Sequence, residues 1–394
     1  MMLYQKFLIT LFLLPICIIN NSDSREYELP AVAPNSIFIV DRVYNLNREI
    51  FELPEGVTLK FCDGGRLQNG TIVGKGTRLK GSSYKVFKDV MIEGTWIVQN
   101  ISSDLFIDKD RPNTLKELFN LASPEVKNVI TITEGEYQVS IDSNNPDALI
   151  IPSNTEVIIN GYISLLPNEL PYYSIVLLSG NNIWLHGKGL IIGDKENHLG
   201  TSGEWGMGIN IKGGNNIKIS ETTVKNCWGD CIYIGGGSTN IHIKCCLLDG
   251  GRRQGISITS AGKVYVEDCT IKNVKGTLPE YAIDVEPNEN QSVEYVQIKD
   301  VEAIDCRGGF MSWHPAKNSS IGTVEIVNCS VSGNVGYYDY RFERADKVIM
   351  KNNKGVKGKI TLSAVNEAVL INNSIKGQIF SDYRLINCEK VIRK

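Results

Sequence analysis

The chain has 394 residues, of which 42% are hydrophobic and 22% are charged, and its formal net charge is −3 at pH 7. This composition is typical of a soluble globular protein. The small negative charge offers no basic surface for a nucleic acid, so nucleic acid is not an expected partner.

The first predicted element is a secretory signal peptide at residues 1–24. Lys6 precedes an apolar run from Phe7 to Ile19, and a polar stretch follows that run. The run is too short to span a bilayer and has the layout of a signal sequence. We therefore expect a secreted, periplasmic or cell-surface protein without a membrane span after signal removal. A lipid anchor at Cys17 and an uncleaved anchor are the alternatives.

A short β region is predicted next. Residues 25–35 contain two prolines and are predicted to form a linker. Residues 36–110 contain short apolar strands separated by glycines, which indicates a small N-terminal β region or the first irregular coils of a longer array.

One helix is predicted, and it begins near Thr114. Asn113 is a plausible N-cap, and Pro124 ends the helix. Four apolar residues form a stripe along it: Leu115, Leu118, Phe119 and Leu121. This stripe predicts a cap or connector that packs against the first full coil.

From about residue 157 to the C-terminus, a short phrase recurs in which apolar and polar residues alternate before a polar turn. The phrases begin at Asn216, Asn240, Lys263, Tyr295, Thr323, Lys347 and Ala368. The steps between their first apolar residues are 24, 23, 32, 28, 24 and 21. A regular period of this length with strand-type alternation predicts an all-β solenoid, which we assign to residues 111–394.

The chain has ten cysteines, and five of them fall at fixed places in the repeat. Cys246, Cys269 and Cys329 share one place in it, and Cys227 and Cys306 share another. This pattern predicts an inward stack of small free thiols rather than a disulfide framework. Cys246 and Cys269 fall on neighbouring rungs, so a bridge between them is the alternative. No cysteine or histidine spacing indicates a metal site.

A second strand can be aligned in each coil, with its second and fourth residues pointing inward and its third and fifth pointing outward. The aligned segments begin at Gly208, Cys231, Gly255, Ala282, Phe310 and Asp339. The predicted outward columns are Asn210, Tyr233, Ser257, Asp284, Ser312 and Arg341, and Lys212, Gly235, Thr259, Glu286, His314 and Glu343. By contrast, the outward residues of the first strand show no common chemistry: Lys218, His242, Tyr265, Gln297, Glu325 and Ile349.

Two irregular stretches, Asp194–Trp205 and Lys275–Tyr281, precede this second strand and are expected to wall one groove. Tryptophans beside charged groups suit sugar rings, whose faces stack on indole while their hydroxyls need polar partners. The predicted substrate-binding residues are Glu204, Trp205, Trp228, Arg252, Arg253, Gln254, His314 and Arg341. A solvated β face is the alternative interpretation.

Asp284 and Glu286 lie two residues apart on one strand, so their side chains should face the same way within about 7 Å. We predict that they form a catalytic carboxylate pair, assisted by Asp230 from two rungs away. Such a pair suits either retaining or inverting glycoside hydrolysis. The neighbouring Arg252 and Arg253 suit a uronate carboxylate. An ion pair and a calcium site are the alternatives for the two acids.

The coils from about 129 to 375 resemble right-handed parallel β-helix proteins of the pectate-lyase-like superfamily. Residues 228–235, WGDCIYIG, and residues 254–258, QGISI, are similar to the Gly-Asp-Asp-Cys and Gly-His-Gly-x-Ser-Ile segments of the polygalacturonase family. The resemblance implies an inverting glycoside hydrolase with aspartates, a histidine and an Arg-Ile-Lys segment at its site.

The sequence departs from that family at four places. Asp230 takes the place of the second aspartate of the Gly-Asp-Asp pair, but Gly229 replaces the first. Met207 stands where a further aspartate is expected, and Gln254 replaces the histidine. Asp284-Val285-Glu286 stands at the position of the Arg-Ile-Lys segment. Galacturonan hydrolysis therefore does not carry over directly.

Three functions remain open at this point. The first is a glycoside hydrolase acting on a polysaccharide or oligosaccharide as a monomer, without a cofactor. The second is a polysaccharide lyase acting on a uronate-containing glycan, for which calcium held by Asp230, Asp284 or Glu286 is an option. The third is a glycan-binding β-helix protein without catalysis.

Overall fold

The computed structural model describes residues 26–81, 84–314, 316–333, 335–356, 360–375, 378–379 and 384–393. The predicted signal peptide, with Cys17, lies outside the described residues.

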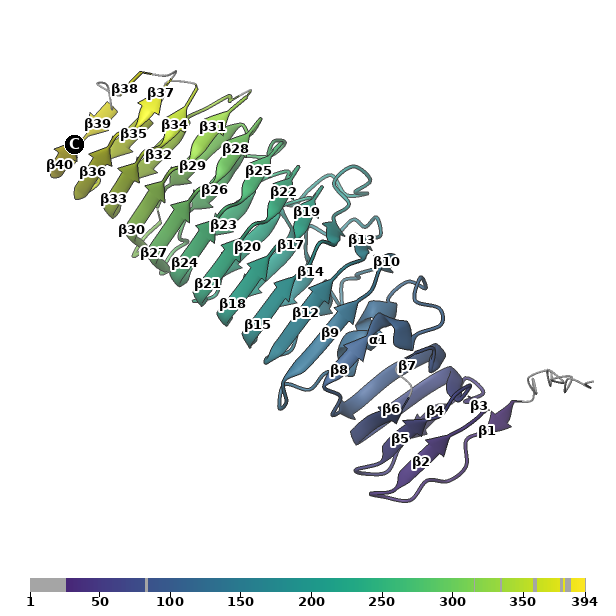
Figure 1. The fold of residues 1–394 in the computed structure, drawn as a ribbon. Coiled ribbons are helices and arrows are strands. Elements are labelled where there is room, and N and C mark those ends of the chain that lie inside the picture. Colours follow the sequence, from purple (N-terminus) through teal and green to yellow (C-terminus); the bar gives the residue numbers. More distant parts are fainter. Residues whose placement is uncertain are drawn as a thin grey trace, which may run out of the picture.

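The strands stack along one axis into a rod, with the N-terminal region at one end and the last coils at the other (Figure 1). Each full coil gives one strand to each of three sheets, which we call sheet 1, sheet 2 and sheet 3; from β11 onward the chain passes through them repeatedly in this order. Neighbouring strands of a sheet come from successive coils and pair in parallel, apart from β37 and β38. The right-handed parallel β-helix expected from the sequence is confirmed.

Sheet 1 contains β11 (Asp147–Ile150), β14 (Tyr172–Leu178), β17 (Trp205–Lys212), β20 (Ile232–Gly235), β23 (Ile256–Ile258), β26 (Tyr281–Val285), β29 (Gly308–Ser312), β32 (Tyr340–Glu343), β35 (Ile360–Ser363) and β39 (Arg384–Ile386). Sheet 2 contains β8 (Asn100–Ser102), β9 (Asn128–Ile132), β12 (Thr155–Ile159), β15 (Asn181–His186), β18 (Asn215–Ser220), β21 (Thr239–Lys244), β24 (Ala261–Glu267), β27 (Ser292–Lys299), β30 (Ser320–Val327), β33 (Ala345–Lys351), β36 (Glu367–Ile371) and β40 (Lys390–Arg393). Sheet 3 contains β10 (Glu136–Val139), β13 (Tyr162–Leu165), β16 (Leu190–Ile192), β19 (Thr223–Lys225), β22 (Leu247–Asp249), β25 (Thr270–Lys272), β28 (Glu302–Ile304), β31 (Ser330–Ser332), β34 (Lys354–Gly355), β37 (Ser374–Ile375) and β38 (Gln378–Ile379).

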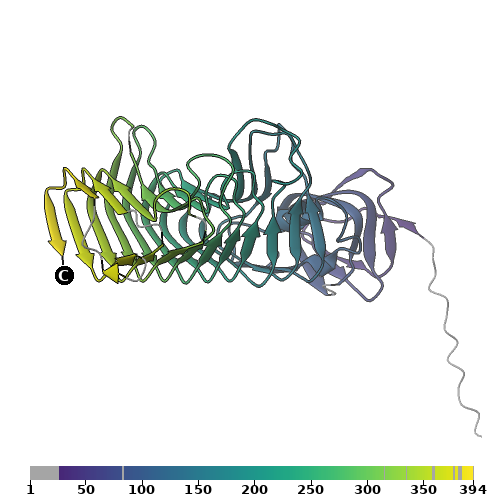
Figure 2. The ribbon, with the colours of Figure 1, turned by 90° about the horizontal axis from the view of Figure 1, so that it is seen from above.

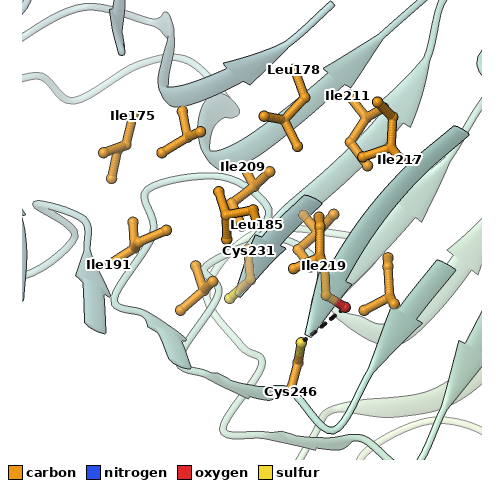
Figure 3. Packing of buried hydrophobic residues seen from close by; sticks show 14 of the residues in the cluster. Ile175, Leu178, Leu185, Ile191, Ile209, Ile211, Ile217, Ile219, Cys231 and Cys246 are labelled. Atoms are coloured by element: carbon orange, nitrogen blue, oxygen red, sulfur yellow. Dashed lines mark hydrogen bonds between the residues drawn. The ribbon is translucent and has the colours of Figure 1, made fainter. Parts of the chain in front are cut away.

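The core fills the inside of the coils with apolar side chains stacked in columns (Figure 3). Ile209 and Ile211 of β17 point into it from sheet 1, and Ile217 and Ile219 of β18 point into it from sheet 2. The strict alternation of the sequence produces this arrangement, because successive side chains of a strand face opposite sides. The outward residues of the same strands are thereby left on the surface of the rod.

The repeat-locked cysteines are free and buried, as predicted. Their thiols donate to the carbonyl oxygen two residues earlier, at 3.3 Å for Cys246, 3.1 Å for Cys269 and 3.3 Å for Cys329. The Cys246 thiol also contacts the Ile219 carbonyl of the preceding coil (Figure 3). Cys246 and Cys269 are neighbours without a disulfide, so each thiol serves as a compact apolar group at the corner between sheets 2 and 3.

Helix α1 (Thr114–Asn120) confirms the predicted helix, and its four apolar residues are buried. Asn113 precedes the helix, but its side chain does not cap it. Instead, its amide nitrogen donates to the Ser140 hydroxyl and its amide oxygen accepts from the Ser140 N–H. Glu117 accepts a hydrogen bond from the Ile92 N–H at 2.6 Å, and Asn120 donates to the Ile92 carbonyl at 2.8 Å. These two side chains bond to the backbone N–H and C=O of Ile92, where no strand of the described residues pairs with β7 on that side. The helix therefore covers this edge of β7, as predicted for a cap.

The N-terminal region forms a seven-stranded parallel sheet. Its strands are β1 (Tyr27–Glu28), β2 (Ile37–Val40), β3 (Val43–Asn45), β4 (Ile50–Glu52), β5 (Thr58–Phe61), β6 (Arg66–Gly81) and β7 (Phe87–Trp96), and a single 3₁₀ turn, η1 (Ser103–Leu105), follows. Within the segment predicted as a linker, the short strand β1 pairs with β3. Among the described residues, no helix has the length and apolar character needed to span a membrane.

The register in sheet 2 follows the recurring phrase from β18 to β33. Two rungs differ from the prediction by one residue. In β36, Ala368 rather than Val369 pairs with the core residue Val348. In β29, Phe310 and Ser312 occupy the inward positions, which places Met311 rather than Ser312 beside Asp284. The pattern misleads there because Phe310 and Met311 are both apolar, and because the inward Ser312 hydroxyl is satisfied by the backbone of Glu343.

Candidate functional site

The outward surface of sheet 1 carries a pocket with a volume of about 350 Å³. Its lining residues are Tyr172, Trp205, Met207, Asn210, Lys212, Tyr233, Arg253, Thr259, Glu286 and Asn288. They come from five successive coils, β14 to β26 and the turn that follows β26. Figure 2 shows long loops projecting from one side of the rod. The stacking of coils thus gathers one aromatic, cationic and acidic surface from residues more than a hundred positions apart.

Arg253 is the electrostatic centre of this surface. Its guanidinium lies 3.4 Å from Glu204, 3.4 Å from Asp230 and 3.7 Å from Glu286. The side chain is only 14% exposed. Burial lowers the pKa of Arg253, but the nearby carboxylates outweigh this effect, so the pKa is raised. One buried cation therefore holds three predicted site carboxylates around the pocket.

Asp284 points to the outer side of sheet 1, in register with Ser257, and yet it is fully buried. Gln254 donates from Nε2 to its Oδ2 at 2.8 Å. Burial and the charge of the neighbouring Glu286 raise the pKa of Asp284 well above its ordinary value, which favours its protonated form. Glu286 is the acid of the two that lines the pocket.

Asp230 is also fully buried, directly before β20. Burial raises its pKa to about 6, although Arg253 acts in the opposite direction. Its Oδ1 atom is buried without a hydrogen-bond partner, whereas Oδ2 accepts from Arg253. Asp230 thus lies behind Arg253 rather than on the wall of the pocket.

The departures from the polygalacturonase pattern have structural causes. A Cβ atom at Gly229 would collide with the carbonyl oxygen of Glu204, so an aspartate has no room there. Gln254 is fully buried, and its amide oxygen accepts from the Tyr281 N–H at 2.8 Å while its nitrogen donates to Asp284. A side chain engaged in this way positions Asp284 and does not reach a substrate.

A stack of four planar groups anchors the loop that follows β16. The ring centroid of His198 lies 6.1 Å from that of Tyr173 and 4.0 Å from that of Trp228, and both pairs are stacked. The guanidinium carbon of Arg252 lies 3.7 Å from the Trp228 ring centroid, on the indole face away from His198. Asp194 holds His198 through Nδ1 at 2.8 Å and also bonds the Tyr173 hydroxyl. We call these five residues the loop clamp. Both faces of the Trp228 indole are occupied, so Trp228 and Arg252 build the groove wall and do not stack on a sugar.

His314 lies outside the pocket. Its Nε2 contacts the Arg344 carbonyl, and its Nδ1 contacts the Ser319 hydroxyl at 3.2 Å. Because of the one-residue register difference in β29, Trp313 rather than His314 takes the position next to Glu286 on the following coil. The guanidinium of Arg341 lies 5.2 Å from the centre of the Trp313 ring. An aromatic and cationic surface therefore lies next to Glu286 on its C-terminal side.

Tyr172, Tyr233 and Asn288 were not among the predicted binding residues. Tyr172 belongs to β14, whose outward position was not aligned because the segment YYSIVLL does not alternate. Tyr233 did stand in the predicted outward column, and its aromatic character beside Lys212 was the available signal. Lys212 lies 6.0 Å from the Tyr172 ring centre, so these side chains form one wall of the pocket.

The predicted calcium alternative is not supported by the donor set. Among the described residues, no three His, Cys, Asp or Glu side chains are grouped so as to hold a metal ion. The Arg253 guanidinium occupies the space between Asp230 and Glu286, where a cation would otherwise bind. Arg253 therefore supplies the positive charge beside these two carboxylates.

Comparison with known proteins supports the fold. The family described as right handed beta helix region matches residues 171–321, which include most of the pocket. The chain is 32% identical over 169 residues to the uncharacterized protein YclG of Bacillus subtilis (strain 168), covering 37% of this chain and 29% of YclG. It is 26% identical over 210 residues to the SPbeta prophage-derived uncharacterized protein YorA of the same organism, covering 45% of this chain and 36% of YorA. The aligned region thus spans about a third of the length of these relatives.

Among solved structures, the chain is similar to an exopolygalacturonase from Thermotoga maritima. The TM-score is 0.51 at 13% sequence identity, and the match covers 75% of this chain and 92% of that protein. Identity at this level shows a shared fold only. The resemblance to right-handed β-helix proteins is confirmed in this sense.

Proposed function

We propose that this protein is an exported carbohydrate-active enzyme that hydrolyses a glycosidic bond of a polysaccharide in the sheet 1 pocket. One observation carries the proposal: Glu286 opens onto a pocket lined by Tyr172, Trp205 and Tyr233, and the fully buried Asp284 lies two residues before it on the same side of β26. Aromatic faces and carboxyl groups are the combination that sugar binding and glycoside cleavage require.

We assign the proton transfers of hydrolysis to three acids near Arg253, namely Asp284, Glu286 and Glu204. In hydrolysis, one carboxyl gives a proton to the glycosidic oxygen, while a second removes a proton from the water whose oxygen bonds to the anomeric carbon. Asp284 and Glu286 lie two residues apart on the same side of one strand, and burial raises the pKa of Asp284, so we assign the two acids to act together. Glu204 is the opposing carboxylate.

Glu204 and Glu286 contact different nitrogens of the same guanidinium, Nε and Nη2 of Arg253. Their carboxylates are therefore held apart by the width of one guanidinium group. Inverting hydrolysis uses two carboxyl groups about 6.5–9.5 Å apart, which leaves room for a water molecule, and we propose this role for Glu204 and Glu286.

The aromatic and cationic surface formed by Trp313 and Arg341, beyond the pocket, supports a chain-like substrate. On one side of Glu286 lie the pocket aromatics, and on the other side Trp313 packs against Arg341. A polysaccharide lying along the rod axis contacts both regions, and Glu286 meets it between them. We propose that the protein acts as a monomer.

A lyase is the second candidate, favoured by the two cations Lys212 and Arg253 on the pocket wall. Elimination removes the C5 proton of a uronate to a base and breaks the C4–O bond, and a cation must neutralise the sugar carboxylate. Glycan binding without catalysis is the third candidate. It is favoured by the complete burial of Asp230 and Asp284 and by the engagement of Arg253 with three carboxylates.

The deciding experiment incubates the purified protein with a panel of neutral and uronate-containing polysaccharides. Reducing ends measure hydrolysis or elimination, and ultraviolet absorbance of an unsaturated product marks elimination alone. For a hydrolase, we expect new reducing ends without absorbance, lost by at least about a hundredfold in Glu286→Gln. Glycan binding with neither signal would replace this proposal by the binding function.

A further inference from the structure

A second pocket, with a volume of about 460 Å³, lies on the outer face of sheet 2 near the N-terminal end of the coils. Its lining residues are Glu125, Val126, Lys127, Asn154, Thr155, Glu156, Asn182, Ile183, Trp184, Asn216 and Lys218. They belong to β12, β15 and β18 and to the turn before β9, so none of them lines the sheet 1 pocket.

Trp184 is the organising side chain of this second pocket. Its side chain lies on the outer face of β15 and is 41% exposed. One face stacks on His186 at 4.0 Å with a 20° angle between the rings, and Nε1 donates to the Ser220 hydroxyl at 3.2 Å. His186 is itself held by Glu156 at 3.1 Å. The indole is therefore fixed in place while its other face borders the pocket, which lies on the Asn182 side.

A ladder of asparagine side chains forms the floor beside the indole. Asn182 donates to Asn154 at 3.0 Å, Asn216 donates to Asn182 at 2.8 Å, and Asn240 donates to Asn216 at 3.1 Å. All four have positive φ angles, which asparagine tolerates better than other residues with a side chain. The ladder uses one N–H of each donating amide, so its second N–H is left to meet a ligand hydroxyl.

The charges of this pocket are balanced. Two lysines, Lys127 and Lys218, face two glutamates, Glu125 and Glu156. The site therefore has no net attraction for an anion or a cation. A peptide cannot bind here as an added strand of the sheet, because the backbone of β15 already pairs with β12 on one side and β18 on the other.

The ring surface continues along the rod. In register, Trp184 is followed by Lys218, His242 and Tyr265 on successive strands of sheet 2. His242 stacks on Tyr265 at 4.7 Å, and Tyr265 meets Tyr295 at 5.8 Å. The rungs repeat about every 4.8 Å. Because His242 and Tyr265 stack on each other, they present ring edges rather than free faces, and the ring face that borders the pocket is that of Trp184.

We propose that this surface is a non-catalytic binding site for a neutral glycan chain, with one sugar ring on the free face of Trp184 and its hydroxyls on the asparagine ladder. An exposed indole beside fixed amides suits a sugar, whose faces are apolar and whose edge carries hydroxyls. The site is separate from the sheet 1 pocket and does not depend on the chemistry proposed there.

The test is affinity electrophoresis in gels that contain a soluble neutral glucan, mannan, xylan or galactan, with polygalacturonate as the anionic comparison. The parent protein is Glu286→Gln, so that cleavage does not alter the gel. Trp184→Ala is compared with Trp184→Phe and with Tyr162→Ala, which removes an aromatic ring that is 51% exposed on β13 of sheet 3. Circular dichroism melting confirms that each variant is folded.

We expect retardation by at least one neutral glycan, weakened at least about tenfold by Trp184→Ala, partly retained by Trp184→Phe and unchanged by Tyr162→Ala. Unaltered retardation of Trp184→Ala, retardation by polygalacturonate alone, or no retardation in any gel would each overturn the site. Hydrolysis of a short oligosaccharide by Trp184→Ala with Glu286 intact measures the sheet 1 pocket alone, so failure of the proposed hydrolase is seen separately.

Discussion

Gln254 donates a hydrogen bond from its side-chain nitrogen to Oδ2 of Asp284 at 2.8 Å, and both side chains are fully buried. The same amide accepts from the Tyr281 N–H, so one glutamine fixes both the acid and the start of β26. A polygalacturonase-like histidine is replaced here by a residue that cannot exchange protons. The acid at 284 is therefore held by its neighbours in one orientation beneath Glu286.

Replacing Gln254 by alanine should destabilise the protein by about 1–3 kcal/mol, because the Tyr281 N–H and the Asp284 carboxyl both lose a buried partner. Gln138→Ala is the matched control, since that side chain is exposed on β10 and should cost less than about 0.5 kcal/mol. Urea unfolding of both variants measures the difference. Equal midpoints for the two variants would show that the Gln254 bonds add nothing.

The raised pKa of Asp230, about 6, predicts a stability that depends on pH. The ordinary pKa of an aspartate is 3.8, so the folded protein binds the proton more tightly than the unfolded chain does. The stabilisation is therefore complete below about pH 4 and is lost as the pH rises to about 6. At 1.36 kcal/mol per pKa unit this is at most about 3 kcal/mol.

Asp230→Asn keeps the buried shape without the ionisation. Denaturant unfolding from pH 4 to 7 should show a steeper loss of stability in the wild-type protein than in this variant. Parallel curves across that range would mean that Asp230 titrates normally. Asp284→Asn provides a second comparison, since the pKa of Asp284 is raised in the same direction.

Arg253→Met should destabilise the protein by several kcal/mol at neutral pH, of the order of 3–5 kcal/mol for a buried ion pair that loses one partner. The cost should shrink below pH 6, because the buried Asp230 is then protonated and needs no cation. Arg307→Met is the control, since Arg307 is 52% exposed in its ion pair with Glu280 and should contribute less than about 1 kcal/mol. Calorimetric melting at two pH values distinguishes the two variants.

His198→Ala should release the loop between Asp194 and Trp205, because His198 joins Tyr173 to Trp228 in the loop clamp. We expect hydrogen exchange of the loop amides to accelerate by about tenfold or more, with the coils unaffected. Leu199→Ala is the neighbouring control, since that side chain is 69% exposed. Unchanged exchange in His198→Ala would mean that the loop is held by other contacts.

The repeat was readable because each inward column accepts only apolar or small side chains, so the sequence alone predicts most of sheet 2 and the neighbourhood of Asp284 and Glu286. It did not predict which side of β29 faces inward, because Phe310 and Met311 suit the core equally well. It also assigned Trp228 to sugar binding. The indole instead lies between His198 and Arg252, and the path of a loop that brings His198 there has no periodic signal.

The loop clamp also has a consequence for how such a groove changes between relatives. The segment from Asp194 to His198 is tied to Trp228 of the following coil and, through it, to Arg252 of the coil after that, so its length cannot change without disturbing three coils at once. Residues 199–203 lie outside the stack, but both ends of this span are held: the Leu199 N–H donates to the Asn168 carbonyl at 2.8 Å, and Arg252 donates to the Gly203 carbonyl at 2.9 Å. Insertions and deletions that reshape this wall would therefore arise most readily at residues 200–202, leaving the scaffold and its acids untouched.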